Sequence, residues 1–231
     1  EMTDAGMMEC KKALVEADGD MEKAVVVLRT RGLAAAAKKA GRATNEGTVM
    51  ALVSEDGKTG ALVELNCETD FVGMNEKFKG YAEKIARAAM AANVEDIEAL
   101  KAVDAEGETV EDVLTDAIHT LGENMNLARA AVVEAGGGAS YIHGGGKNGV
   151  LVAFGFGGID PASEGFQTYG RDVAMQVAAA SPVAATRESV PAEVVEHEKA
   201  IYKAQAAESG KPENIQEKMA TGRLEKFYKE N

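Results

Sequence analysis

The segment GALVELNCETDFVGMNEKFKGY, residues 60–81, joins a strand pattern to a helix pattern through a polar turn. Residues 60–65 are apolar and partly alternating, which predicts a half-buried β-strand. Phe78 and Tyr81 begin an apolar face with helical spacing. Phe71 therefore lies in the connection between the two elements, where a large aromatic ring usually has nothing to pack on.

A second copy of this strand and helix follows later in the chain. The copies align at GALV (60–63) with GVLV (149–152), and at FKGY (78–81) with FQTY (166–169). Short strand patterns at residues 48–53 and 139–143 precede the two copies, and each is followed by glycine-rich or polar turn residues. Each copy is therefore predicted to be a β-hairpin followed by a helix.

The turn between strand and helix differs between the copies. The first copy has TDFV at residues 69–72, whereas the second has GFGGIDP at residues 155–161. Because strand and helix recur without this turn, TDFV is not needed to build the fold. Phe71 beside Asp70 on a rigid turn suits insertion into a partner's cleft, while the alternative is a ring packed on its own subdomain, as we expect of Val72.

The remaining chain adds helices and one strand. Two short helices are predicted over residues 7–17 and 21–31, with Asp20 as an N-cap and Gly32 as the C′ glycine. Residues 38–47 have no apolar period and are interpreted as part of a linker. Helical patterns at 94–100 and 110–121, a strand pattern at 126–134 and a charged helical hairpin after Pro191, placed at N1, complete the prediction. The fold class is α+β.

Composition and charge exclude several classes of protein. The net charge of -13 argues against direct binding of nucleic acid, which requires a positive field. There is no apolar run near the ~20 residues of a membrane helix, so no membrane association is expected. Cys10 and Cys67 are expected to be reduced, buried thiols of a cytoplasmic protein. His119 and His197 have no second ligand at metal spacing, so neither a metal nor a cofactor is expected.

An enzymatic interpretation starts from HGGG, residues 143–146, which is similar to the oxyanion loop of lipases. It lacks a Gly-x-Ser-x-Gly nucleophile elbow, because the nearest match, PASEG at 161–165, has no first glycine. The same glycines do not form a phosphate loop, since Asn148 replaces the Ser or Thr that would bind magnesium. We therefore predict that the chain is not an enzyme and has no catalytic residues.

Longer motifs carry a resemblance to a known family. NCETDFV, with GMMECKKALVEADGDMEKAVVVLRTRG before it and LGENMNLAR and SYIHGGGKNGVLV after it, resembles the bacterial elongation factor Ts family over essentially the whole chain. That family exchanges guanine nucleotides on elongation factor Tu during translation elongation. The resemblance implies a ubiquitin-associated (UBA)-like helical module at 1–34, with a truncated first helix, and a linker at 35–47. Two related core subdomains follow at 48–136 and 137–186, each a hairpin-plus-helix α/β sandwich, and the second is expected to be incomplete. A coiled-coil helical hairpin is expected at 187–228.

The resemblance also implies roles for particular residues. Thr69, Asp70, Phe71 and Val72 would insert into the G domain of GDP-bound elongation factor Tu and disturb its Mg²⁺ coordination. Met7 and Met8 would contact another G-domain helix, and His143 would hold a separate β domain of the same partner. The coiled-coil arm is linked to homodimer contacts in some members of the family.

The chain departs from the family pattern in three places. Asp4 in TDAGMM stands where the family has glycine, and Gly73-Met74 replaces an Ala and a basic residue beside the turn. After residue 226, where the family chain returns to the second subdomain, we expect the last pieces of that sheet to be missing. An alternative function also stays open. The chain could be a passive adaptor that binds elongation factor Tu without changing the rate of nucleotide release, or another protein-interaction module without exchange activity.

Overall fold

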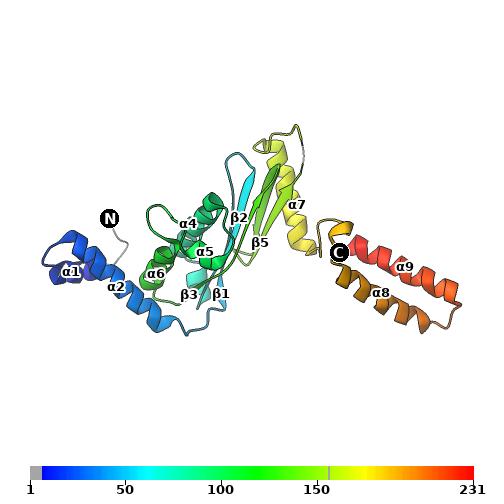
Figure 1. The fold of residues 1–231 in the computed structure, drawn as a ribbon, viewed down its shortest axis with the longest axis horizontal. Helices are drawn as coiled ribbons and strands as arrows, with labels where there is room; N and C mark the ends of the chain where they lie inside the picture. The colour runs from blue at the N-terminus through cyan, green and yellow to red at the C-terminus, as the bar shows by residue number, and fades with distance from the viewer. Residues whose placement is uncertain (1–6, 156) are drawn as a thin grey trace. The chain divides into compact units, whose positions relative to one another are not determined.

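The computed structural model describes residues 7–155 and 157–231, so the departure at Asp4 lies outside the described residues. It divides after Ala178 into two compact units, each described here by itself. The first unit holds two N-terminal helices, two antiparallel sheets and the helices packed on them, and the second is a helical hairpin (Figure 1). This mixture of helices and antiparallel sheets confirms the α+β class. No helix in the described part of the chain combines the length and apolar character needed to cross a membrane.

The N-terminal helices are α1 (Met7–Glu16) and α2 (Met21–Lys39), which pack on each other through a small core of Ala13, Ala17, Ala24 and Leu28. The Asp20 side chain accepts a hydrogen bond from the Lys23 N–H and caps α2, as predicted. The predicted end of this helix at Gly32 is wrong. Gly32 is buried inside α2, where an added Cβ would lie 3.5 Å from the Thr115 methyl group, so the helix continues and packs on α6. Residues 35–39, expected in the linker, are therefore helical.

The first sheet has the antiparallel order β1 (Glu46–Val53), β2 (Thr59–Cys67), β3 (Met125–Glu134). Val63, Leu65 and Cys67 alternate along β2 and are fully buried, which confirms the predicted half-buried strand. Their core partners come from α4 (Glu76–Ala92), α5 (Ile97–Lys101) and α6 (Val110–Leu121). Phe78 and Ile85 on α4 are also fully buried in this core.

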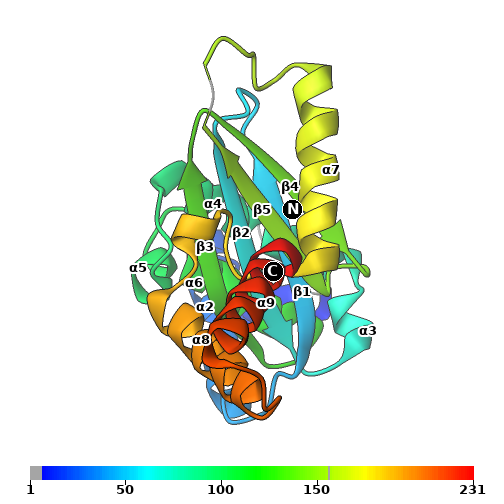
Figure 2. The same cartoon turned by 90° about the vertical axis from the view of Figure 1, so that its right-hand side faces the viewer.

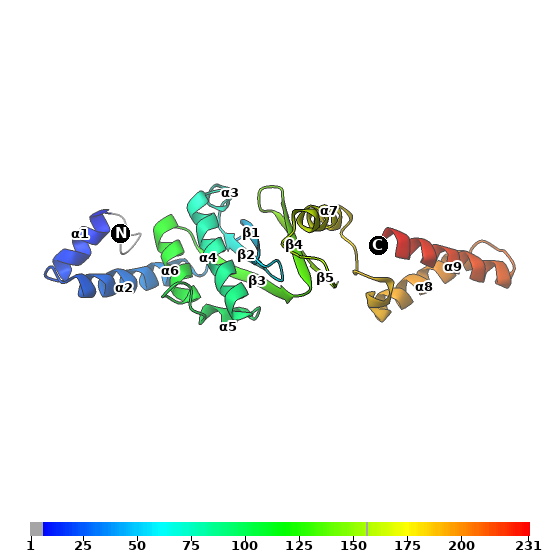
Figure 3. The same cartoon turned by 90° about the horizontal axis from the view of Figure 1, so that it is seen from above.

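The second sheet is the hairpin of β4 (Gly137–His143) and β5 (Asn148–Phe154), followed by α7 (Glu164–Ala180). The two sheets contact each other, and α7 covers the far side of the hairpin, as Figures 2 and 3 show. Phe154 on β5 meets Phe166 on α7 edge to face, with ring centroids 5.2 Å apart. The first unit therefore contains a four-layer stack of helices, sheet, sheet and helix.

The two hairpins interlock through equivalent residues of the repeated sequence. A Cβ on Gly60 would lie 2.6 Å from the Leu151 Cδ1, and a Cβ on Gly149 would lie 2.9 Å from the Leu62 Cδ1. Each copy thus supplies a glycine that makes room for the leucine of the other copy. The alignment of GALV with GVLV is reproduced as a reciprocal contact between the sheets.

The second unit contains a short 3₁₀ turn (Arg187–Ser189), α8 (Ala192–Ala207) and α9 (Glu213–Glu230), which pack on each other. Pro191 is the N-cap of α8, one residue before its predicted place at N1. Arg187 binds both carboxylate oxygens of Glu225, at 2.6 and 2.8 Å, and stacks on the Tyr228 ring at 4.1 Å. These contacts tie the beginning of the arm to its last helix.

Candidate functional site

The TDFV segment forms the start of a very short helix, α3 (Asp70–Gly73), rather than an irregular turn. The Thr69 hydroxyl accepts a weak hydrogen bond from the Val72 N–H at 3.4 Å and so acts as the N-cap. Asn75 then caps α4 by accepting from the Lys77 N–H at 2.8 Å. We call residues 69–72 the contact turn. Two caps thus follow each other along the chain, Thr69 at the start of α3 and Asn75 at the start of α4.

Neighbouring side chains of the contact turn point in opposite directions. Phe71 is 80% exposed, and Met74, one helical turn further on, is 58% exposed. Val72 instead packs against the core beneath the first sheet. Gly73 is buried against β1, since a Cβ there would lie 3.2 Å from the Gly47 carbonyl oxygen. Val72 and Gly73 therefore anchor α3, and Phe71 is presented to solvent beside the exposed Asp70 carboxylate.

A pair of glutamates, which the sequence patterns did not indicate, ties the contact turn to the segment that leads into β3. The Glu123 carboxylate accepts hydrogen bonds from the N–H groups of Glu68 and Thr69, at 3.1 and 3.0 Å, and from the Thr69 hydroxyl at 2.6 Å. Glu68 in turn accepts from the Asn124 N–H at 2.6 Å. Glu123 lies in the LGENMNLAR motif, directly after the helix-ending Gly122.

The charge of Glu68 is stabilised by its surroundings. The Asn124 N–H, helped by the Arg42 guanidinium at 3.3 Å, lowers the pKa of Glu68 below its ordinary value. Burial has the opposite effect on the neighbouring thiol. Loss of solvent and the nearby Glu123 carboxylate raise the pKa of Cys67 to about 11. Cys67 is thus an inert, fully buried thiol that donates to the Thr69 carbonyl oxygen at 3.1 Å.

The other predicted contact residues lie on other elements. Met7 and Met8 begin α1 and are 86% and 63% exposed. His143 ends β4, is exposed, and its Nδ1 lies 2.9 Å from the Tyr141 hydroxyl. The structure therefore leaves all three side chains accessible without bringing them into one cluster with Phe71.

Strand β1 connects the contact turn with the His143 hairpin. Gly73 at the end of α3 packs on Gly47, near the start of β1. Two residues further along, the Val49 N–H donates to the Gly146 carbonyl oxygen at 2.7 Å, and Lys147 pairs with Glu46. Figure 2 shows α3 beside β1 at this end of the sheet. The first residues of β1 thus hold both predicted contact elements, the contact turn and the His143 hairpin.

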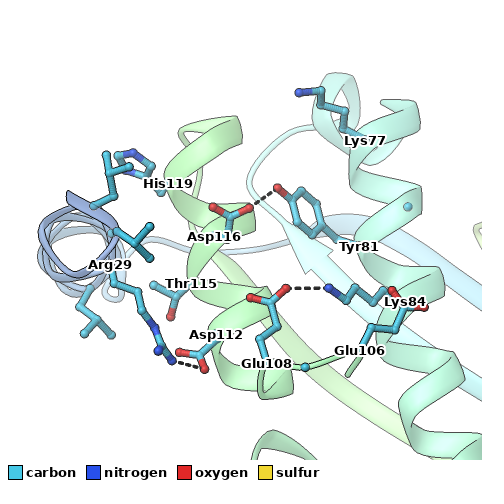
Figure 4. Close-up of a pocket in the computed structure, with 16 residues that line it drawn as sticks. Arg29, Lys77, Tyr81, Lys84, Glu106, Glu108, Asp112, Thr115, Asp116 and His119 are labelled. Carbon is cyan, nitrogen blue, oxygen red and sulfur yellow. Dashed lines mark hydrogen bonds and ion pairs between the residues drawn. The ribbon is translucent and has the colours of Figure 1, made fainter. Parts of the chain in front are cut away.

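A separate cleft of about 780 Å³ lies between α2, α4 and α6, and Figure 4 shows its charged lining. Arg29 pairs with Asp112, and Lys84 pairs with Glu108 at 2.6 Å. The Tyr81 hydroxyl donates to Asp116 at 2.5 Å. These charged groups of the cleft are paired with each other, so we interpret the cleft as the packing interface between α2 and the core.

Comparison with known proteins shows the family of the chain. The sequence model of a family described as Elongation factor TS matches residues 68–231. The chain belongs to the elongation factor Ts family. Proteins named Elongation factor Ts from Clostridium botulinum and Clostridium perfringens are each 50% identical to it, over 236 and 233 aligned residues. Each alignment covers 100% of this chain and 76% of the relative. The elongation factor Ts match thus extends over both α1 and the contact turn.

Proposed function

We propose that this chain is a guanine nucleotide exchange factor for elongation factor Tu in the cytoplasm. Membership of the elongation factor Ts family supports this function. The single structural observation that carries it is the 80% exposure of Phe71 on a turn whose neighbours are buried and hydrogen-bonded. Phe71, with the exposed Met74 beside it on α3, offers an apolar surface that a partner can cover.

In the proposed mechanism, residues 69–72 enter the G domain of GDP-bound elongation factor Tu. Magnesium in such GTPases bridges phosphate oxygens and neutralises their charge. Insertion of Phe71 next to the Asp70 carboxylate would displace groups of the partner that hold this ion. The hold on GDP would then weaken without any covalent step, so the chain would not be an enzyme in the bond-breaking sense.

Magnitudes show that the contact turn needs help. Burial of one Phe side chain supplies about 1.5–3 kcal/mol. An acceleration of ~10⁴ in GDP release requires ~5.5 kcal/mol, at ~1.36 kcal/mol for each factor of ten. The remainder must come from other contacts that favour the open partner. Met7 and Met8 on α1, against a second G-domain helix, and His143, against a separate β domain, are the proposed sources.

Each predicted domain is proposed to make a different set of contacts. A UBA-like module up to residue 34, core subdomains at 48–136 and 137–186, and an arm at 187–228 would each serve a separate purpose. The first three would hold the partner, and the arm would support contacts between two copies of the chain. Nucleic acid has no direct part, because the net charge is -13.

Linkage provides the test of exchange against passive binding. If the chain weakens GDP binding by some factor, GDP must weaken binding of the chain by the same factor. Stopped-flow release of fluorescent GDP from elongation factor Tu should accelerate strongly as this chain is added. A passive adaptor would bind the GTPase and leave the release rate unchanged, which would disprove the proposed function.

A further inference from the structure

We propose that Glu123 is the positioning residue of the contact turn, and that its carboxylate sets the direction in which α3 presents Phe71. The proposal rests on the proposed exchange function and adds a residue to it. Glu123 does not belong to the contact turn and is 54 residues from Thr69 along the chain. It acts through Thr69 and not by touching nucleotide.

The β-ladder ends just before the contact turn. The last paired residues of β2 and β3 are Cys67 and Met125. Beyond this pair the N–H groups of Glu68 and Thr69 have no strand to donate to, and part-buried N–H groups without partners are costly. The Glu123 carboxylate accepts from both, at 3.1 and 3.0 Å. It therefore continues the pairing of the sheet for two residues, with a side chain in place of a strand.

Glu123 also orients the hydroxyl group that caps α3. The Thr69 hydroxyl donates its hydrogen to Glu123 at 2.6 Å, which leaves its lone pairs free to accept from the Val72 N–H at 3.4 Å. Hydrogen bonds to a carboxylate are short and strong. The bond from the Val72 N–H to the Thr69 hydroxyl is long by comparison, so the orientation of this hydroxyl depends on Glu123. Loss of the carboxylate would leave the hydroxyl free to rotate and the first turn of α3 free to fray.

A reciprocal bond makes the arrangement rigid. The Glu68 carboxylate accepts from the Asn124 N–H at 2.6 Å, while the Asn124 side chain donates to the Arg42 carbonyl oxygen at 2.7 Å. Residues 68–69 and 123–124 thus hold each other from both sides. With the backbone at Thr69 held and Val72 packed on the core, Phe71 is kept on the outer, solvent-facing side of α3.

Three variants separate a positioning role from a general role in folding. Glu123→Gln keeps the shape and one carbonyl oxygen, and its amide can donate to the Thr69 hydroxyl. Glu123→Leu keeps the volume but accepts no hydrogen bond. Glu64→Leu is the matched control, because Glu64 is a half-buried glutamate on the same sheet that pairs with Arg129.

The first measurement is fluorescent GDP release from elongation factor Tu across a range of factor concentrations. Glu123→Leu should lower the maximal rate by about tenfold or more, since small misplacement of a positioned group lowers a rate strongly. The half-saturating concentration should change little, because Met7, Met8 and His143 still bind. Glu123→Gln should recover most of the rate, and Glu64→Leu should match the wild-type chain. Wild-type rates in Glu123→Leu would overturn the proposal.

The second measurement needs no partner and separates this inference from the exchange function. Amide hydrogen exchange followed by NMR should show protected N–H groups at Glu68 and Thr69 in the wild-type chain and in Glu123→Gln. Both should exchange much faster in Glu123→Leu, while amides in the centre of β2 stay protected. Unprotected amides in the wild-type chain would overturn the positioning role. A wild-type chain that fails to release GDP would instead refute the exchange function.

Discussion

Phe71 and Phe78 have the same side chain and lie seven residues apart, yet Phe71 is 80% exposed and Phe78 is fully buried. Phe78 belongs to the first sheet's core on α4, whereas Phe71 lies on the outer side of α3. The burial of Phe78 contributes to stability, and the exposure of Phe71 does not. This contrast allows binding and folding to be tested separately within one short segment.

Phe71→Ala should slow GDP release from elongation factor Tu by about 10- to 100-fold, the equivalent of the 1.5–3 kcal/mol that burial of a Phe side chain supplies. The melting temperature of the variant should remain that of the wild-type chain, because the ring contacts little of its own fold. Stopped-flow release and circular dichroism measure the two quantities.

Ile159→Ala is the matched control for Phe71→Ala. Ile159 is an apolar side chain, 54% exposed, in the segment of the second copy that corresponds to the contact turn. Its truncation removes exposed apolar surface without altering the contact turn, so exchange should be unchanged. Equal losses in both variants would mean that exposed apolar surface in general, and not Phe71 in particular, promotes GDP release.

Phe78→Ala should have the opposite profile. Truncation of a fully buried Phe leaves a cavity and costs about 3–5 kcal/mol of stability. Urea unfolding of the isolated chain should show this loss as a lower midpoint with a similar slope. At a temperature where the variant is still folded, its exchange rate should stay close to that of the wild-type chain, because the Thr69 cap of α3 and its bonds to Glu123 do not involve Phe78. A stable Phe78→Ala protein would contradict the assignment of the core.

The sequence patterns predict the elements well where the decisive contacts are local. Alternation along β2 and the Asp20 cap are confirmed, because both depend on neighbours within a few residues. The prediction at Gly32 is wrong, because local rules treat a glycine at this place as the end of a helix. In the folded chain Gly32 lies inside α2, where it packs against Thr115 on α6. Glu123 could not be found from the sequence because its partners lie 54 and 55 residues away. Local pattern predicts the elements, whereas the contacts that aim the contact turn form only in the folded chain.

Cys67 should react with thiol reagents far more slowly than Cys10 in the native protein. The pKa of Cys67 is raised to about 11 by burial and by Glu123, so at pH 8 only about one thiol in a thousand is ionised, and the sulfur is also inaccessible. Cys10 is only half-buried on α1. Alkylation at pH 8 followed by mass spectrometry should label Cys10 first. In denaturant both should react, and equal native labelling would show that the sheet opens at its end.

Acid should weaken the bond between Glu68 and Asn124. The pKa of Glu68 is lowered in the folded chain by the Asn124 N–H and then by Arg42, so its contribution to stability is present above the ordinary pKa of about 4.3. That contribution is lost as the pH falls through the lower, folded-state pKa. Glu68→Gln should therefore be less stable than the wild-type chain at about pH 6 and should approach it at about pH 3. Urea unfolding at both pH values measures the difference, and a constant difference would rule out the charge of Glu68 as its cause.

Gly146→Ala should loosen the His143 hairpin from the first sheet. Gly146 has a φ of +102°, and a Cβ at this position would overlap the Thr48 hydroxyl and lie 3.2 Å from the Thr48 Cβ. Gly145→Ala is the matched control, since Gly145 also has a positive φ but has open space around it. Gly146→Ala should therefore be less stable than Gly145→Ala by about 1–3 kcal/mol, the usual cost of an overpacked contact. Because β1 holds both the hairpin and α3, Gly146→Ala should also bind elongation factor Tu more weakly in titration calorimetry. Equal losses of stability in Gly146→Ala and Gly145→Ala would show that only the backbone conformation of these glycines matters.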